Sequence, residues 1–357
     1  MSGINKHKRK NSLDRKIRPG EYLIESSIKG ISFISFAVII LIFVFVFRET
    51  LPIFSKQEKK VIPQEEMVME TYGEETTPTE SDKAIQQMND NAEANASASE
   101  VYEFKMKDLA GKDWQPVSTE PKFGLWPLIL GTIKVTLLAV LFGAPIAILA
   151  ALYTAVFAPK KIKEFIKPTI ELLAGFPSVV IGFFALVTLA TLFQDTFGYA
   201  YRLNAFVGGI ALSLAVIPII YTVAEDAISS VPRIYTEVSL ALGANKWQTA
   251  IFVVLPAATP GIFASLILGV GRAFGETMIV LMATGNAPLA SLGIFDPVRT
   301  LSATIGAEMA EVVFGDTHYN VLFFIGSLLF VITFVLNAVA EFYVRNRLMK
   351  RFRGESS

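Results

Sequence analysis

Two side chains of opposite charge, Arg272 and Glu276, lie within a long apolar stretch that covers residues 258–283. Either charge costs about 2.5–3.5 kcal/mol at the centre of a membrane-spanning helix, so both must face protein or water. Four residues apart on a helix, they share a face and can pair. The pair supports two interpretations: an internal ion pair that locks helix packing, or a guanidinium that donates forked hydrogen bonds to a tetrahedral anion while the carboxylate holds it in place.

The sequence lacks the residues that catalysis would need. The sequence has no cysteine and only two histidines, His7 and His318, which fall outside the predicted membrane spans. It has no serine–histidine set, no paired intramembrane aspartates and no H-x-x-x-H spacing. A phosphate-binding G-x4-G-K-[ST] loop is also absent from the sequence. We therefore predict no catalytic residue, no metal ligand and no cofactor bound by this chain.

The composition is that of a membrane protein. Hydrophobic residues make up 52% of the 357 residues and charged residues 18%, whereas soluble domains are about 25% charged. Residues 1–30 and 48–125 carry 36 of the 64 charged side chains, which leaves 28 for the other 249 residues. A helix needs about 20 mostly apolar residues to cross a bilayer. Soluble enzymes and nucleic-acid-binding proteins are therefore poor candidates.

Six apolar stretches are long enough to cross a bilayer as helices, at residues 28–47, 130–157, 168–193, 204–224, 258–283 and 320–344. Basic residues concentrate on one side of the resulting topology, with eight in residues 1–30, four in 158–167 and five in 345–357. The connections on the other side at 194–203 and 284–318 hold one Arg each. Because cytoplasmic segments carry the excess of Lys and Arg, both termini are predicted to be cytoplasmic.

These predictions divide the chain into a basic tail at 1–27, a first transmembrane helix at 28–47, an acidic extracytoplasmic insertion at 48–125, a transmembrane core at 126–345 and a basic tail at 346–357. The insertion holds sixteen acidic and nine basic residues, and its middle is almost free of branched apolar and aromatic side chains. Such a segment cannot bury enough surface to offset the entropy of ordering, so it is predicted to be largely disordered. A small docking module for an external partner is the alternative, with residues 101–116 as its most structured part.

Three prolines, Pro145, Pro177 and Pro218, interrupt the predicted spans. A broken helix exposes backbone groups that are tolerated only beside a cavity or other protein. Ser178 follows Pro177 and can present its hydroxyl and amide to an anion at the start of a half-helix, although an ordinary proline kink is the alternative. Lys134 lies near the outer end of its span, where it either snorkels to the surface or attracts an anion.

The connection at residues 225–256, on the predicted cytoplasmic side, is long for a loop in a compact protein. Pro232 suits the first turn of a helix. Apolar residues follow from Ile234 at helical spacing, and Gly243 stands where a left-handed helix cap would lie. We therefore predict a short amphipathic helix, a glycine turn and a second helix that leads to Leu255-Pro256, together projecting from the cytoplasmic face.

The same loop resembles the EAA signature, E-A-A-x3-G-x9-I-x-L-P, of binding-protein-dependent ABC importer permeases. Glu237 and Gly243 have the spacing of that signature, and Leu255-Pro256 completes it. Val238 and Ser239 replace its two alanines, and Val253 replaces its isoleucine. The resemblance implies that the loop seats in a groove of a cytoplasmic ATPase, with Glu237, Gly243, Ala244, Leu255 and Pro256 as the coupling residues.

Two further segments narrow the resemblance. GVGRAFGETMIVLMATGNAP in the fifth span and LLAGFPSVVIGFFAL in the third are similar to segments of the permease subunits of phosphate (Pst) importers, and to the PstC type more than to the PstA type. The resemblance covers roughly residues 126–345. It implies the type I importer fold, all-α with six transmembrane helices and a cytoplasmic coupling helix. It also implies a substrate path lined by Arg272, Glu276, Ser178 and Thr277.

The resemblance also implies partners and a location. The chain is expected in the bacterial cytoplasmic membrane, beside a sister permease subunit, a cytoplasmic ABC ATPase dimer that binds ATP and Mg, and an extracytoplasmic phosphate-binding protein. Three alternatives remain open from the residues: a PstA-type subunit, a permease for another oxyanion, and an ATP-independent secondary anion transporter. The last would need no long coupling loop, and the sequence shows no second half that repeats the charges of the fifth span.

Overall fold

The computed structural model describes residues 19–54, 105–118 and 120–343. Three segments lie outside the described residues: the first eighteen residues, most of the acidic insertion and the tail at 346–357. The predicted disorder of the insertion therefore stays a prediction. Helix α1 (Pro19–Thr50) extends into the predicted tail at 1–27, and the part of it that could cross a membrane begins at Ser26.

Six of the described helical segments are long and apolar enough to cross a membrane, as the sequence predicts. They cover Ser26–Ile53, Trp126–Phe157, Ser178–Phe197, Ala205–Ser229, Lys246–Phe274 and Thr317–Val339. The remaining secondary structure described between residues 105 and 343 is helical except for one antiparallel pair of two-residue strands, β1 (Trp114–Gln115) and β2 (Lys122–Phe123), and an isolated bridge between Gly285 and Val298. The chain is therefore an all-α membrane protein.

Helix α1 belongs to a unit of its own, distinct from residues 50–357. Its side chains from Ile28 to Phe45 are exposed, and almost all of them are apolar. A helix that is apolar on every side suits a hydrocarbon environment. By itself, α1 is therefore a membrane-anchoring helix.

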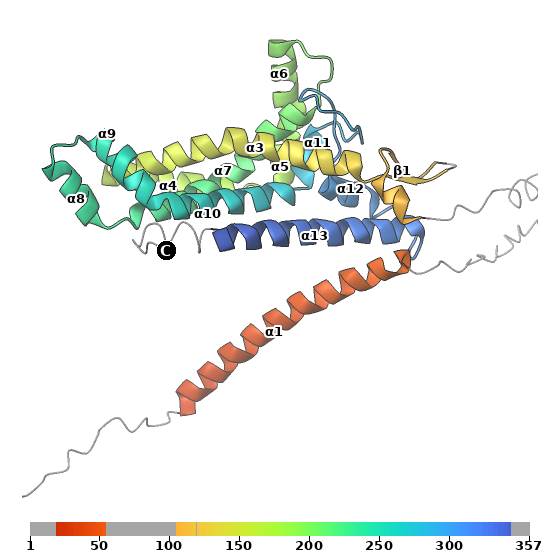
Figure 1. Cartoon of the computed structure of the whole chain (residues 1–357), viewed down its shortest axis with the longest axis horizontal. Coiled ribbons are helices and arrows are strands. Elements are labelled where there is room, and N and C mark those ends of the chain that lie inside the picture. Colours follow the sequence, from red (N-terminus) through yellow and green to blue (C-terminus); the bar gives the residue numbers. More distant parts are fainter. Residues whose placement is uncertain (1–18, 55–104, 119, 344–357) are drawn as a thin grey trace, which may run out of the picture. The chain divides into compact units, whose positions relative to one another are not determined.

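Four long helices form the centre of the second unit: α3 (Trp126–Leu152), α7 (Ala205–Ser229), α10 (Leu255–Phe274) and α13 (Thr317–Tyr343). Figure 1 shows them running alongside one another, with α3 and α10 packed on α7 and α13 packed on α10. Small residues allow the close approach of α3 and α7, since a Cβ on Gly209 would lie 2.5 Å from the Cβ of Leu138. Such contacts replace the hydrophobic effect as the basis of packing between membrane helices.

The predicted range of the third span, 168–193, is wrong at its N-terminal end, because a break separates the span from the helix before it. Helix α4 (Lys160–Ala174) is followed by a turn at residues 175–177, and then by α5 (Ser178–Phe184), the π-helical turn η4 (Ala185–Leu189) and α6 (Ala190–Phe197). Residues 168–174 belong to α4, which is amphipathic and has no fully buried residue. Apolar composition alone did not separate the two helices, because the apolar side chains continue across the break.

The fifth span begins earlier than predicted and ends earlier as well. It runs without interruption through α9 (Lys246–Thr249), the π-helical turn η5 (Ala250–Val254) and α10, and it stops at Phe274. The predicted range of 258–283 therefore omits twelve N-terminal residues and includes a turn and the separate helix α11 (Met278–Ala283). Glu276 accordingly lies beyond the helix that carries Arg272.

Pro145 and Pro218 do not break their spans. They lie inside the continuous helices α3 and α7, so of the three prolines only Pro177 marks an interruption. Membrane helices accept an internal proline when neighbouring groups satisfy the freed carbonyl. His318, predicted to lie outside the spans, is the second residue of α13 and of the last candidate span.

The described end of the acidic insertion is folded. The short helix η2 (Met106–Ala110), β1 and β2 carry Leu109, Trp114 and Phe123 into a hydrophobic cluster with α12 (Leu301–Glu308) and α13. Glu308 fixes this arrangement: it accepts hydrogen bonds from Trp114 Nε1 at 3.1 Å and pairs with Arg299 and with His318 Nε2, the latter at 2.9 Å. Residues 105–118 and 120–125 therefore belong to the core unit and not to a solvated insertion.

The Glu308 cluster (Trp114, Arg299, Glu308 and His318) makes the stability of the fold depend on pH. Burial raises the pKa of the Glu308 carboxyl, but the hydrogen bonds from His318 and Trp114 and the charge of Arg299 outweigh it and hold the pKa below its usual value of 4.5. A lowered pKa stabilises the folded state above the unfolded value, and this stabilisation is lost as the pH falls through the folded value.

We expect Glu308→Gln to lower the free energy of unfolding of the purified protein at neutral pH by about 1.5–3 kcal/mol, because hydrogen bonds to a charged group are lost. The difference from the wild type should shrink as the pH falls below about 4.5. Melting curves in detergent across this pH range would measure it. Glu311→Gln, which removes an exposed carboxylate three residues away, is the control, and an equal loss in both variants would contradict the role of the cluster.

Candidate functional site

The predicted pair of charges is present. Arg272 occupies the last turn of α10, and Nη2 lies 3.3 Å from Oε2 of Glu276, which follows in the turn at residues 275–277. The two side chains differ in exposure, since 49% of the Arg272 side chain is accessible but only 4% of the Glu276 side chain. The carboxylate is therefore enclosed by protein, while the guanidinium keeps donors free for another group.

A second break lies beside Arg272. The turn that ends α4 and the first residues of α5 line a cavity of about 200 Å³ together with α7 and Arg272, which we call the Arg272 pocket. Its lining residues are Leu173, Ala174, Phe176, Ser178, Ile181, Ala215, Ile219 and Arg272. The structure thus brings Ser178 and Arg272 together, although 94 positions separate them in the sequence. Two interrupted helices meet at this pocket, as in membrane proteins that bind ions between half-helices.

The other predicted path residue, Thr277, belongs to the turn that follows α10. Its hydroxyl donates to the carbonyl of Gly275 at 3.5 Å, which is a weak bond. Thr277 does not line the Arg272 pocket, so its part in the site is to shape the turn that carries Glu276. The prediction that it lines the path stays a prediction.

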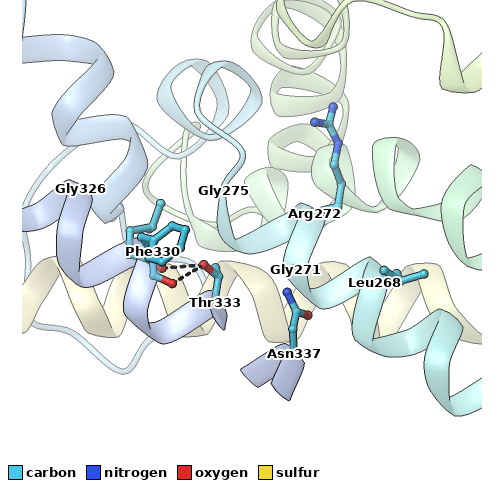
Figure 2. A pocket seen from close by; sticks show the side chains of 9 residues that line it. Leu268, Gly271, Arg272, Gly275, Gly326, Phe330, Thr333 and Asn337 are labelled. Atoms are coloured by element: carbon cyan, nitrogen blue, oxygen red, sulfur yellow. Dashed lines mark hydrogen bonds between the residues drawn. The ribbon is translucent and has the colours of Figure 1, made fainter. Parts of the chain in front are cut away.

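A larger hollow lies on the opposite side of α10, between this helix and α13. It has a volume of about 440 Å³, and its lining includes Gly271, Gly275, Gly326, Thr333 and Asn337. Figure 2 shows that the Arg272 side chain points away from Phe330, Thr333 and Asn337, although Arg272 is among the residues that line this hollow. The hydroxyl of Thr333 is already used by the carbonyls of Leu329 and Phe330.

Lys134 is held by backbone groups. Its Nζ donates to the carbonyl of Gly293 at 2.9 Å and to the carbonyl of Ser291. It therefore fastens the loop between α11 and α12 to α3, and this contact favours the structural interpretation of Lys134.

The predicted coupling loop contains α8 (Arg233–Ala241), a glycine turn and α9, which continues into α10. Gly243 has a φ of +87°. The amide of Gly243 donates to the Leu240 carbonyl and the amide of Ala244 to the Ser239 carbonyl, which is the bonding pattern of a Schellman cap. The predicted left-handed turn at Gly243 is thus confirmed. Figure 1 shows α8 and α9 at the end of the bundle opposite β1 and α12.

The residues predicted to couple to an ATPase are accessible. Glu237 and Pro256 are exposed, and Ala244 and Leu255 are half-buried. Apolar side chains on the same segment are also exposed, among them Ile234, Val238, Leu242, Trp247 and Phe252. An accessible apolar surface on a projecting loop is typical of a docking site.

Two contacts that hold the coupling loop were not predicted. The buried hydroxyls of Ser239 and Thr249 lie 2.9 Å apart and join α8 to the end of α9. The ring of Trp247 packs on Phe157, at the end of the second span, with centroids 4.5 Å apart. The partners of these two contacts lie ten and ninety positions apart in the chain. A serine or a tryptophan at such a position does not indicate its partner, so the sequence could not predict either contact.

Comparison with known proteins decides the family. Residues 143–347 match the family described as "Binding-protein-dependent transport system inner membrane component", and this range contains the Arg272 pocket and the coupling loop. The chain belongs to this family. It is a multi-pass permease, a transport component and not a catalytic one.

Curated relatives of the permease agree with this assignment. The "Probable ABC transporter permease protein YqgH" of Bacillus subtilis is 36% identical over 227 residues, which cover 64% of this chain and 74% of that protein. The "Phosphate transport system permease protein PstC" of Mesorhizobium japonicum is 32% identical over 258 residues, or 67% of this chain and 78% of that protein. "PstC 1" of Mycobacterium tuberculosis is 32% identical over 246 residues, or 62% and 72%.

Proposed function

We propose that the permease carries inorganic phosphate across the bacterial cytoplasmic membrane and forms half of the translocation path. The observation that carries the proposal is the half-exposed guanidinium of Arg272, which borders the Arg272 pocket together with Ser178. A tetrahedral oxyanion accepts the forked hydrogen bonds that an arginine donates. The cation also offsets the cost of removing an anion from water. The relatives named as phosphate transport permeases support the same substrate.

Glu276 supports reversible binding of the anion. Its enclosed carboxylate lies 3.3 Å from the guanidinium of Arg272. It tempers the charge of Arg272, so that the anion can leave again.

The coupling loop supports an ATP-driven mechanism. We propose that it docks on a cytoplasmic ABC ATPase dimer, which binds the ATP and Mg that this chain does not bind. A sister permease subunit completes the path, and an extracytoplasmic binding protein delivers phosphate. Closure of the ATPase dimer then moves α8 and α9, and since α9 continues into α10, the motion reaches Arg272.

Uptake of radiolabelled phosphate tests the proposal. The complete transporter, produced in cells that lack other phosphate importers, should accumulate label, and excess unlabelled sulfate should not compete. Copurification of an ATPase with the permease should accompany uptake. Uptake that sulfate suppresses would indicate another oxyanion, and uptake that persists without any ATPase partner would indicate a secondary transporter.

We propose that both termini are cytoplasmic, on the basis of the basic residues at 158–167 and in the two tails. Because the chain has no native cysteine, single replacements can be labelled with a membrane-impermeant thiol reagent in intact cells. We expect label at Val117→Cys and Leu292→Cys, whose positions are 89% and 83% exposed. Lys161→Cys should be labelled only after the membrane is permeabilised. Label at position 161 in intact cells would reverse the orientation.

A further inference from the structure

The turn that carries Glu276 is enclosed by two helices. On one side, Gly182 of α5 contacts α11 so closely that an added Cβ would lie 3.1 Å from the carbonyl oxygen of Met278. On the other side, an added Cβ on Gly306 of α12 would lie only 2.4 Å from the Cγ2 of Thr277. The backbone after Arg272 is therefore held between α5 and α12, and larger side chains at either glycine would displace it.

A hydrogen bond from α12 also reaches the backbone of Glu276. The hydroxyl of Ser302 donates to the carbonyl oxygen of Glu276 at 2.7 Å, and both residues are buried. The carbonyl of a buried turn residue between two helices has no intrahelical partner and needs another donor. Thr300 Oγ1 lies 3.2 Å from Ser302 Oγ. Because a hydroxyl has a single proton and Ser302 gives its own to Glu276, Thr300 is the donor of that pair.

Helix α12 is itself anchored. The Thr300 hydroxyl accepts from the amide of Ala303 at the start of α12, and Thr132 of α3 accepts from the amide of Leu301 at 3.0 Å. The position of Glu276 therefore depends on a chain of contacts that runs from α3 through α12 to the turn. The Glu276 carboxylate in turn lies against Arg272.

We propose that Ser302 and Gly306 of α12 are positioning residues, which hold the turn at 275–277 so that the Glu276 carboxylate offsets the charge of Arg272. The substrate that Arg272 receives rests on the function proposed above, but the effect on its charge does not. If α12 loosens, the carboxylate moves from the guanidinium, and the pocket becomes more positive. An anion would then bind more tightly and leave more slowly.

The electrostatic potential of the Arg272 pocket tests this without any substrate. Phe176→Cys places a thiol in the lining of the pocket, in a chain without other cysteines. The assembled transporter in detergent is labelled with a negatively and a positively charged methanethiosulfonate of similar size, and the ratio of the two rates is measured. A merely structural change alters access for both reagents and leaves the ratio unchanged.

We expect Ser302→Ala to raise the ratio of anionic to cationic labelling by about fivefold, which corresponds to about 1 kcal/mol, because the displaced carboxylate interacts less strongly with the charge of Arg272. Ser265→Ala is the matched control: Ser265 is equally buried, but its hydroxyl bonds only to Ile262 of its own helix. Its labelling ratio should equal that of the parent.

Gly306→Ala should also raise the ratio, because the added Cβ collides with the methyl group of Thr277. Adding Thr277→Ser to the same chain removes that methyl group and should restore the ratio to the value of Thr277→Ser alone.

A double-mutant cycle completes the test. Glu276→Gln should raise the ratio by itself, and Ser302→Ala should add nothing to it, because the charge that Ser302 positions is then absent. The proposal is overturned if Ser302→Ala leaves the ratio unchanged, or if it raises the ratio equally with and without Glu276. Failure of phosphate uptake by the wild type would instead refute the proposed substrate and leave this result standing.

Discussion

Phosphate uptake should fall by about 100-fold or more when Arg272→Gln and Glu276→Gln are combined, while the transporter still inserts and assembles with its ATPase. The double replacement removes both charges but keeps a polar, hydrogen-bonding amide at each position, and Glu276→Gln also keeps the side-chain length. Hydrogen bonds to a charged group contribute about 1.5–3 kcal/mol each, so losing a forked pair corresponds to about two orders of magnitude.

Single replacements do not separate the two interpretations of the pair. Arg272→Gln leaves the enclosed carboxylate of Glu276 without its counter-ion, which destabilises the fold whatever the function of the pair. A pair that only locks helix packing should tolerate the double replacement. A guanidinium that receives an anion should not, because no cation then remains to offset desolvation.

A second ion pair of the chain provides the control. Lys167 of α4 lies 2.5 Å from Glu225 of α7, with 43% and 3% of the side chains exposed, close to the 49% and 4% of Arg272 and Glu276. Lys167→Gln with Glu225→Gln should therefore perturb packing to a similar degree but retain uptake. Near wild-type uptake by the Arg272–Glu276 double variant would show that this pair only stabilises helix packing. An equal loss of uptake in both double variants would remove the evidence for a transport role.

Much of the fold could be predicted because hydropathy and charge act locally. About 20 apolar residues in succession determine that a helix crosses the membrane, and all six crossings were found. The Gly243 turn could also be predicted, since a glycine after an amphipathic segment is the usual left-handed cap. In both cases the decisive residues lie within a few positions of the structure that they determine.

The breaks in the helices could not be predicted in the same way, because they depend on distant residues. Pro145 and Pro218 remain inside helices, yet α10 ends at Phe274 with no proline nearby. The turn after α10 is stabilised by Ser302 and fits between Gly182 and Gly306, which lie 30 to 94 positions away. Likewise, Trp114 is buried through a hydrogen bond to Glu308, 194 positions later. A single sequence gives no sign of such pairs.

The coupling loop leads to the second prediction with a large effect. Gly243→Val should lower ATPase activity that depends on the binding protein, and phosphate uptake with it, by about tenfold, while the permease remains inserted. A side chain in the left-handed region costs about 1–2 kcal/mol, and a β-branched one is a strong outlier there. Relief of this strain would open the Schellman cap and turn α8 away from α9, so that fewer molecules present a loop that fits the ATPase.

Two variants separate loss of coupling from general instability. Gly198 caps α6 with a φ of +68° and has free space around it, so Gly198→Val imposes the same strain away from the coupling loop and should leave coupling intact. Gly243→Asn should preserve most of the activity, because asparagine tolerates the left-handed conformation. The measurement is ATPase activity of the reconstituted complex with and without the binding protein. If the binding protein stimulates the ATPase activity of the Gly243→Val complex as fully as that of the wild type, the proposed role of the loop is contradicted. The strain at residue 243 would then have no effect on the contact that transmits closure of the ATPase dimer to Arg272.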